Sequence, residues 1–341
     1  MIAAAIRRIV EGESLGREEM YALFGEVMDG HATEVQKAAL LIALRMKRET
    51  PDEITGAAMA MRARVTPLSV DADTVIDTCG TGGDGRGTFN ISTLAAVVAA
   101  AAGALVAKHG NRAVSSACGS ADLLRQLGAN IDLDAAQTTD VLKRVGMAFL
   151  FAPRLHPAMG ALVAVRRELG IRTIFNVLGP LTNPAFARRQ VMGVYSAGLV
   201  ETVAEVLRNL GAVHALAVHS RDGLDEISVC APTLVCELRD GALRTYELTP
   251  AEIGLEIHDP EELRGGDAAA NAEIAGRILG GEKGARRDIV LANAAAALYV
   301  GGLAASIRDG VQLAASVIES GEARRKLESL IAATNAVGRG L

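Results

Sequence analysis

The pattern of hydrophobic and polar positions changes near residue 70. Before that point, apolar residues recur at helical spacing, as at Ile2, Ile6 and Ile9, which predicts amphipathic helices. After residue 73, short β-branched runs alternate with alanine-rich segments, and this alternation predicts an α/β domain with a mostly parallel central sheet. We therefore expect a small all-helical domain over residues 1–68 and a larger α/β domain over residues 73–341.

Two capping boxes mark helix starts in the N-terminal part, at residues 33–36 and 50–53. In a capping box, two side chains satisfy backbone N–H groups that the first helical turn leaves unpaired. The second box has Pro51 at the first helical position, and its helix should end near Arg64. The first box begins with Thr33 and is followed by an apolar stripe, which consists of Val35, Ala39, Ile42 and Met46.

Five short runs are candidate strands of a parallel sheet, and a later pair resembles a hairpin around Asp240-Gly241. Residues 157–188 fit neither pattern, because they are rich in arginine, glycine and proline. We expect part of this segment to return to the helical domain, which would place a hinge and a ligand cleft between the domains. The expected strands are 74–77, 104–107, 148–151, 191–195 and 213–218, with hairpin strands 233–238 and 243–247 and closing helices near 268–280, 286–302 and 311–319.

Composition and charge exclude several classes of protein. Half of the 341 residues are hydrophobic, whereas disordered chains combine low hydrophobicity with high net charge. The net charge of −5 disfavours general binding to nucleic acid, which needs a basic surface. The longest apolar run, residues 94–107, is too short to cross a membrane and predicts a buried helix followed by a strand. The four cysteines show no C-x-x-C spacing, so a reduced, cytoplasmic protein is the simplest interpretation.

A glycine-rich segment, residues 77–93, follows the first expected strand and leads into an alanine-rich helix. Its glycines allow the backbone to approach a ligand closely, and the helix N-terminus offers free N–H groups to an anion. Asn90, Ser92 and Thr93 add capping or phosphate-contacting groups. These features predict a cradle for a phosphate or diphosphate. The alternative is a flexible glycine turn, which the interleaved polar residues disfavour.

Two other phosphate-binding motifs do not fit this segment. Residues 80–85 match the dinucleotide pattern G-x-G-x-x-G, but the next strand ends in Lys108 instead of the acidic residue that would hold a ribose. The lysine of a P-loop is also absent, because Thr88 follows Gly87. The segment therefore points away from a nicotinamide dinucleotide.

A second anion loop, residues 108–116, follows the next expected strand and precedes another helix start at residues 117–124. Ligands of open α/β sheets bind at the carboxyl ends of the strands, so the two loops predict a ligand with several phosphates. Solvated surface charge is the alternative for Lys108 and Arg112. We expect Asp122 to support the helix start instead of the ligand.

Together these segments resemble the anthranilate phosphoribosyltransferase family. The resemblance is carried, in order and spacing, by residues 80–93, 108–124, 156–159, 166–184 and 223–228. It implies a nucleoside phosphorylase-like fold, with a helical domain hinged to an α/β domain, and a homodimer formed through the helical domains. It also implies Mg²⁺-dependent transfer of the phosphoribosyl group of 5-phosphoribosyl diphosphate (PRPP) to anthranilate in tryptophan biosynthesis.

The resemblance implies a role for each matched residue. Ala113 stands where the family often has serine, so one hydroxyl is lost from the second loop. Anthranilate would meet Gly80, Asn111, Arg166 and, more weakly, His156, and Mg²⁺ would be held by Ser92, Asp225 and Glu226. The residues implied to surround PRPP are Gly80, Gly83, Asp84, Thr88, Asn90, Ile91, Ser92, Thr93, Lys108, His109, Gly110, Asn111, Arg112, Ala113, Val114, Ser115, Ser116 and Ser120.

The chemistry of the residues leaves some roles open. Asp225 and Glu226 suit Mg²⁺, although alone such a pair would be a solvated acidic turn. Arg166 can bind the carboxylate of anthranilate through two of its N–H groups, but an ordinary surface arginine is the alternative. No general base is evident, and His109 or His156 could serve. An acid in a phosphate cradle repels its ligand, so Asp84 would act through a metal, a water molecule or the ribose hydroxyls, and its role stays open.

Two other functions compete with this interpretation. A pyrimidine nucleoside phosphorylase shares the fold, but residues 108–112 and Arg166 resemble the anthranilate enzyme instead. A relative that binds nucleic acid without catalysis would need a basic face, which the net charge of −5 disfavours. We expect small-molecule substrates and neither nucleic acid nor a membrane as partners.

Overall fold

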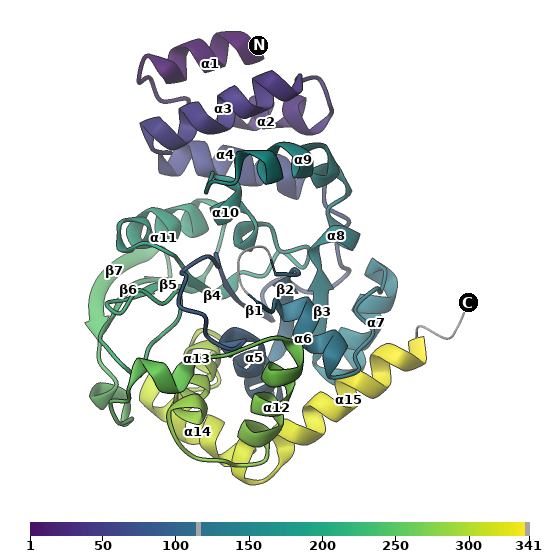
Figure 1. Cartoon of the computed structure of the whole chain (residues 1–341), viewed down its shortest axis with the longest axis vertical. Helices are drawn as coiled ribbons and strands as arrows, with labels where there is room; N and C mark the ends of the chain where they lie inside the picture. Colours follow the sequence, from purple (N-terminus) through teal and green to yellow (C-terminus); the bar gives the residue numbers. More distant parts are fainter. Residues whose placement is uncertain (114–116, 338–341) are drawn as a thin grey trace.

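The computed structural model describes residues 1–113 and 117–337, and its N-terminal helices form a layer set apart from the central sheet (Figure 1). Later helices from the segment that fitted neither sequence pattern lie beside this layer. Their Leu162, Val165 and Phe175 belong to the same buried cluster as Phe24 of the N-terminal layer. The N-terminal helices are α1 (Ile2–Val10), α2 (Arg17–Met28), α3 (Glu34–Lys47) and α4 (Pro51–Arg62), and the later ones are α9 (Gly160–Leu169) and α10 (Phe175–Leu178).

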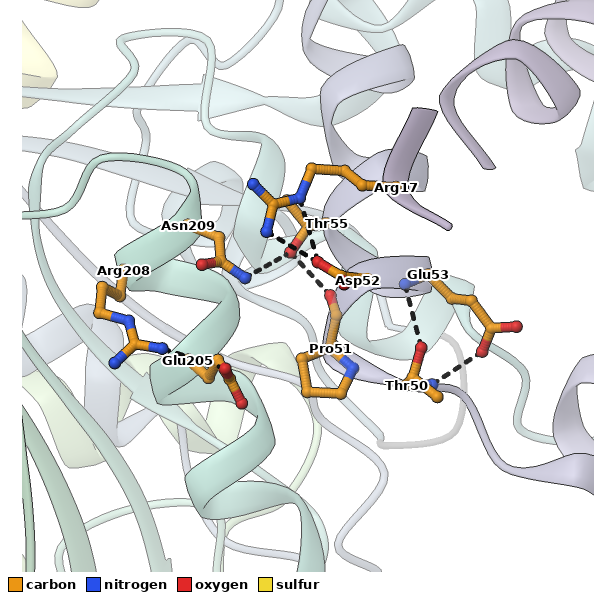
Figure 2. Close-up of polar contacts among 9 residues, drawn as sticks. All are labelled: Arg17, Thr50, Pro51, Asp52, Glu53, Thr55, Glu205, Arg208 and Asn209. Atoms are coloured by element: carbon orange, nitrogen blue, oxygen red, sulfur yellow. Dashed lines mark hydrogen bonds and ion pairs between the residues drawn. The ribbon is translucent and has the colours of Figure 1, made fainter. Parts of the chain in front are cut away.

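Both predicted capping boxes are confirmed. At the start of α4, the Thr50 hydroxyl accepts a hydrogen bond from Glu53 N, and Glu53 Oε2 accepts one from Thr50 N at 2.8 Å (Figure 2). The same exchange joins Thr33 and Gln36 at the start of α3. Each box pairs N–H groups that a helix start leaves free, so these two helices begin where the sequence predicts.

The apolar stripe of α3 is not the face that this helix buries. Val35 is 79% exposed and Met46 is 80% exposed. The opposite face, with Leu40, Leu41 and Leu44, packs into the core instead. Periodicity alone cannot choose between two faces that are both apolar. An unpartnered apolar stripe remains on the outside of the helical layer.

One seven-stranded sheet forms the centre of the chain, with the order β3-β2-β1-β4-β5-β6-β7. The first five strands are parallel, and the hairpin β6–β7 adds two antiparallel strands at one edge. The mostly parallel sheet and the hairpin are confirmed. The strands are β1 (Val75–Gly80), β2 (Leu105–Gly110), β3 (Met147–Phe151), β4 (Arg189–Gly193), β5 (His214–Ser220), β6 (Thr233–Arg239) and β7 (Ala242–Leu248).

Two of these strands extend further than expected into the anion loops. β1 continues to Gly80, which pairs with Gly193, and β2 continues to Gly110, which pairs with Phe151. Glycine lowers strand propensity, so the sequence predicted earlier ends. Pairing with neighbouring strands overrides that preference and draws Lys108 into the sheet.

Side chains on the two faces of the sheet belong to two different cores. Leu216 and Val218 of β5 face one cluster, whereas Ala215 and Ala217 between them face the other. The first cluster includes the buried apolar run of α5 (Ile91–Ala101), as predicted, and the second extends into the helical layer. Helices around the first cluster are α7 (Ala135–Val145), α12 (Ala268–Leu279), α13 (Ala285–Val300), α14 (Ile307–Glu319) and α15 (Glu322–Val337), and α11 (Val200–Asn209) lies on the other face.

The final helix, α15, was not predicted. Its buried residues Leu327 and Leu330 pack into the first cluster, but charged residues are frequent in the segment and mask its periodicity. Among the residues that the structure describes, no helix is long and apolar enough to cross a membrane.

Candidate functional site

The first glycine-rich loop lies between the carboxyl end of β1 and the start of α5. Four of its glycines, Gly82, Gly83, Gly85 and Gly87, have φ values of 65 to 75°, a region that residues with a β-carbon rarely adopt. Turns of this kind present successive backbone N–H groups to an anion. The glycines therefore adopt the conformations that a phosphate cradle requires, and the cradle itself stays a prediction.

Asp225 joins this loop from 143 residues away in the sequence. Its Oδ2 accepts a hydrogen bond from Gly82 N at 2.7 Å. Two glycines make the approach possible, because a β-carbon at Gly80 would overlap the Asp225 carboxylate and one at Gly193 would overlap its carbonyl oxygen. Two parallel strands therefore end in glycine where the segment that carries Asp225 crosses them.

Three carboxylates gather beside the loop. Burial, together with repulsion from the neighbouring Asp84 carboxylate, raises the pKa of Asp225 to about 7. Burial also raises the pKa of Glu226 to about 8, with added repulsion from Asp225 and Asp84 and a partial offset from Lys108. Such crowding of like charge favours the binding of a cation. Among the described residues, no three histidines, cysteines or acids form a complete metal site.

Lys108 lies beneath the loop and is not a solvated surface residue, because it is only 2% exposed. Its Nζ donates hydrogen bonds to the Thr78 carbonyl at 2.5 Å and to Ser92 Oγ at 3.2 Å. Burial lowers the pKa of Lys108, and the Asp77 carboxylate opposes that effect. The lysine thus places a buried cation against the first turn of α5.

The other predicted residues of the first loop differ in their accessibility. Ile91 is buried, so only its backbone could meet a ligand. Thr93 is also buried, and its hydroxyl has no hydrogen-bond partner among the residues that the structure describes. Thr88 forms a β-bridge with Arg264. Asn90 was expected either to cap α5 or to contact phosphate, and its side chain makes no capping hydrogen bond. It donates to the Cys118 carbonyl and so ties the first loop to the second.

The second loop is closed by side chains at the start of α6 (Ser120–Gln126). Ser120 Oγ donates to the Asn111 carbonyl at 3.2 Å, and Asp122 accepts hydrogen bonds from the N–H groups of Ala113 and Gly119. The helix-start role expected for Asp122 is confirmed. Arg112 lies over the ring of Phe151. Of the predicted residues in this loop, Val114, Ser115 and Ser116 lie outside the described residues.

Two histidines meet behind the second loop. Nε2 of His109, on β2, lies 3.1 Å from Nε2 of His156, which follows the short helix α8 (Ala152–Leu155). Burial lowers the pKa of His156 to about 4, and burial together with His156 lowers the pKa of His109 well below its usual range. Both imidazoles are therefore neutral at pH 7, and one donates to the other.

Arg166 lies on α9, in the helical layer. Its guanidinium stacks over the ring of Phe175, 5.2 Å from the centroid, and burial lowers its pKa. Within residues 1–113 and 117–337, no hydrogen bond or ion pair holds this guanidinium. The contacts of the chain itself do not join Arg166 to the two loops, so a ligand would have to make that link.

One contact residue, Arg172, was missed by the sequence analysis. Its guanidinium donates a hydrogen bond to the Gly83 carbonyl and lies 4.5 Å from the ring centroid of Tyr195. Tyr195 N in turn donates to Thr81 Oγ1 at 3.0 Å. Arg172 lies inside the motif segment 166–184, so its position and positive charge could have marked it as a candidate site residue. Asn271, which donates to Asn90 Oδ1 from α12, lies outside every motif and carried no such signal.

Comparison with known proteins agrees with this arrangement. Residues 72–324 match the glycosyl transferase family α/β domain, and residues 3–65 match the glycosyl transferase family helical bundle domain. A relative from Anaeromyxobacter sp. (strain K), an anthranilate phosphoribosyltransferase, is 58% identical over 98% of this chain and 99% of its own length. The chain belongs to the anthranilate phosphoribosyltransferase family.

Solved structures of this family have the same fold. The enzyme from Thermus thermophilus superposes with a TM-score of 0.92 at 44% identity, covering 97% of this chain and 99% of that one. The enzyme from Saccharomyces cerevisiae, solved in complex with PRPP and Mg, superposes with a TM-score of 0.89 at 27% identity, covering 98% of each chain. The expected fold is therefore confirmed.

Proposed function

We propose that this chain transfers the 5-phosphoribosyl group of PRPP to the amine of anthranilate, giving N-(5-phosphoribosyl)anthranilate and diphosphate in tryptophan biosynthesis. The observation that carries the proposal is 58% identity over nearly the whole chain to an anthranilate phosphoribosyltransferase. The anion loop and the buried lysine at one sheet edge support it because they suit a substrate with several phosphates, and the carboxylates support it because they suit the Mg²⁺ that accompanies the phosphates.

Departure of diphosphate is the step that this site would assist. The bond from C1′ of the ribose to the diphosphate oxygen breaks, the leaving group keeps the electron pair, and the anthranilate nitrogen forms the new bond to C1′. Negative charge grows on the diphosphate, so donors already in place lower the barrier. In our proposal those donors are the N–H groups of the first loop, the N-terminus of α5 and the Lys108 ammonium.

We propose that Asp225, Glu226 and Ser92 hold Mg²⁺. The carboxylates fit such an ion, because a cation offsets the repulsion that raises their pKa values. Two carboxylates are enough, since Mg²⁺ commonly completes its shell with phosphate oxygens and water. When bound, Mg²⁺ supplies positive charge that neutralises the diphosphate.

Anthranilate would bind on the side of the helical layer. We propose that the free guanidinium of Arg166 grips its carboxylate, with Asn111, the backbone of Gly80 and His156 as further contacts. The aryl amine is already a nucleophile at neutral pH and has only to lose a proton during or after attack. The neutral imidazole pair of His109 and His156 can accept that proton.

The activity is tested by the fluorescence of anthranilate, which is consumed in the reaction. The protein contains no tryptophan, so its own emission is weak. Loss of the signal should require enzyme, PRPP and Mg²⁺ together, with thymidine and phosphate as the control for a nucleoside phosphorylase. Folded protein that leaves anthranilate unchanged in the presence of intact PRPP would overturn the proposal.

We also propose that two copies associate through the helical layer, and that the protein acts in the cytoplasm. The exposed stripe of α3, with Val35 79% and Ile42 36% exposed, supplies an apolar face for a second copy. The described residues form no disulfide, which agrees with a reducing compartment. In light scattering, the protein should have twice its chain mass of 35.4 kDa, and Val35→Glu with Ile42→Glu should yield a folded monomer. A monomeric wild type would contradict this arrangement.

A further inference from the structure

The acidic pair, Asp225 and Glu226, lies on a segment without regular secondary structure. Residues 221–232 connect β5 to β6, all of them are described, and none belongs to a helix or strand. Leu224 and Ile227, on either side of the pair, are buried in the first cluster. Burial removes the backbone of such a segment from water, so its N–H and C=O groups need partners within the protein. The partners of Ile227 therefore decide how firmly the pair is held.

Asn293, on α13, pairs with both backbone groups of Ile227. Its Oδ1 accepts a hydrogen bond from Ile227 N at 3.0 Å, and its Nδ2 donates to the Ile227 carbonyl at 2.9 Å. A neighbouring antiparallel strand would pair with a residue by the same exchange. Nδ2 also donates to the Ile289 carbonyl, one turn back on α13, at 2.8 Å. The amide is therefore itself held in one orientation.

An amide is not what the packing of α13 requires at this position. Asn293 is only 2% exposed, and its helix neighbours Leu291, Ala292, Ala294 and Ala295 are buried and apolar. Asparagine has a lower helix propensity than alanine, and a buried amide is costly unless it is hydrogen-bonded. The requirement for an amide here comes from the segment that carries the acidic pair.

The segment is held from the opposite side as well. Asp225 passes over Gly193 of β4, where a β-carbon would overlap the Asp225 carbonyl oxygen. Asn293 contacts the segment two residues later, from a helix that packs against β1, β4 and β5. The backbone around the acidic pair thus lies between the strand ends and α13.

The charges of the site explain why a firm hold matters. Without a cation, the carboxylates of Asp84, Asp225 and Glu226 repel one another. This repulsion pushes them apart, whereas Mg²⁺ demands a nearly octahedral shell of oxygen ligands. A backbone that is already in place when the ion arrives reduces the cost of assembling that shell.

We propose that Asn293 is a positioning residue for the metal site: by pairing with both backbone groups of Ile227, it holds the Asp225 and Glu226 carboxylates ready for Mg²⁺. This role rests on the proposed function, which assigns the ion to these carboxylates. Residues behind the direct ligands of a metal commonly contribute roughly 10- to 100-fold to its affinity. A purely structural role would instead lower stability and leave the affinity for the ion unchanged.

The first test uses wild-type protein alone. Amide hydrogen exchange, followed by mass spectrometry of peptides that span residues 224–229, reports whether the segment is held before a ligand binds. We expect slow exchange without any metal and little further change when Mg²⁺ and PRPP are added. Fast exchange that slows only after Mg²⁺ and PRPP are added would overturn the proposal, because the ligands would then order the segment.

The second test measures metal binding without catalysis. Mn²⁺ replaces Mg²⁺, and its binding is followed by the relaxation rate of water protons, without PRPP because PRPP itself binds metal ions. Asn293→Ala should raise the Kd for Mn²⁺ about tenfold. Asn335→Ala is the matched control and should leave the Kd unchanged, because the Asn335 amide also donates to a carbonyl one turn back and to a distant one, Ile331 and Gly128, but on α15.

Thermal unfolding shows whether each variant is folded, and the exchange test decides the matter if Asn293→Ala does not fold. A folded Asn293→Ala variant that binds Mn²⁺ as tightly as the wild type would overturn the proposal.

Activity gives a third readout. In Asn293→Ala, the Mg²⁺ concentration for half-maximal rate should rise about tenfold, and saturating Mg²⁺ should restore kcat, because every proposed ligand is still present. A loss of kcat that Mg²⁺ does not restore would indicate a general structural defect and would contradict the positioning role.

The double variant Asp225→Asn with Glu226→Gln separates this inference from the proposed function. If it binds Mn²⁺ as the wild type does, the metal site itself is wrongly assigned, and the role of Asn293 fails with it. If the double variant loses Mn²⁺ binding and Asn293→Ala retains it in full, the metal site stands and only the role of Asn293 fails.

Discussion

Two buried lysines in this molecule differ in how their charge is balanced. In the helical layer, Lys47 Nζ lies 2.8 Å from Glu53 Oε2, and Glu53 is fully buried. The same carboxylate also accepts hydrogen bonds from the N–H groups of Leu15 and Thr50. The charges of Lys47 and Glu53 are paired with each other within the chain, so this network fastens α4 and requires nothing from outside.

At the sheet edge the balance is incomplete. Among the described residues, the Lys108 ammonium donates hydrogen bonds only to a carbonyl and a hydroxyl, while Asp84, Asp225 and Glu226 crowd together nearby. Uncompensated buried charge costs stability. A ligand that carries phosphates and a divalent cation would satisfy both signs at once. The comparison indicates that matched buried charge serves the fold, and unmatched buried charge marks the site.

The largest effect should follow from neutralising the unmatched carboxylates. Asp225→Asn combined with Glu226→Gln keeps the shape and the acceptor for Gly82 N, so the fold should persist and thermal stability should not fall. Loss of metal and leaving-group stabilisation should lower kcat/KM about 1,000-fold. Steady-state assays over a Mg²⁺ titration, with thermal unfolding alongside, measure both. If the dependence of activity on Mg²⁺ is unaltered, Asp225 and Glu226 do not hold the metal.

The matched pair should give the opposite result. Glu53→Gln leaves Lys47 buried without a counter-charge, so the free energy of unfolding should fall by about 3 kcal/mol. The kcat of the molecules that remain folded should stay near the wild-type value. Urea unfolding and active-site titration separate the two quantities. A Glu53→Gln variant that is stable but inactive would contradict the conclusion that this ion pair serves the fold and not the site.

A smaller and more selective effect is expected where anthranilate, the acceptor of the phosphoribosyl group, is proposed to bind. Arg166→Ala removes the proposed contact to the anthranilate carboxylate and should raise the KM for anthranilate about 30-fold, from about 2 kcal/mol of charge-assisted hydrogen bonding. The KM for PRPP should change little. Arg167→Ala, at the exposed neighbour, is the matched control. Equal effects on both substrates would show that Arg166 supports the fold instead.

The smallest effect concerns the neutral histidine pair. Burial lowers the pKa of His156 to about 4, from 6.5. Between these values the unfolded chain binds a proton that the folded chain does not, so stability decreases as the pH falls. The free energy of unfolding should drop by about 1 to 2 kcal/mol from pH 7 to pH 5. His156→Gln should flatten this dependence and His31→Gln, at an exposed histidine, should not.

Much of the fold and of the loops could be predicted from local signals. The two capping boxes, the hairpin at Asp240 and the buried run after residue 90 all appeared where the patterns indicated. Glycines spaced through a polar segment also predicted the shape of the first loop. These features depend on neighbours a few residues apart, so the sequence pattern contains them.

Features that depend on distant partners could not be predicted in this way. The stripe of α3 remained outside because another face met the core. The helix α15 was missed because its charged residues mask the periodicity, and only its packing against α5 and α7 shows which face is buried. The contact of Arg172 with Gly83 also joins residues far apart in the sequence. Periodicity records that a helix is amphipathic but does not record what packs against it.

The sequence by itself determined which chemical groups this protein has and their order along the chain: two anion loops, an adjacent acidic pair and an arginine-rich return segment. Only the tertiary structure decided their charge balance. It drew Lys108 into the sheet and brought Asp225 against Gly82. The physical reason is that burial and pairing set the energy of a charge, and both depend on parts of the chain that are distant in sequence.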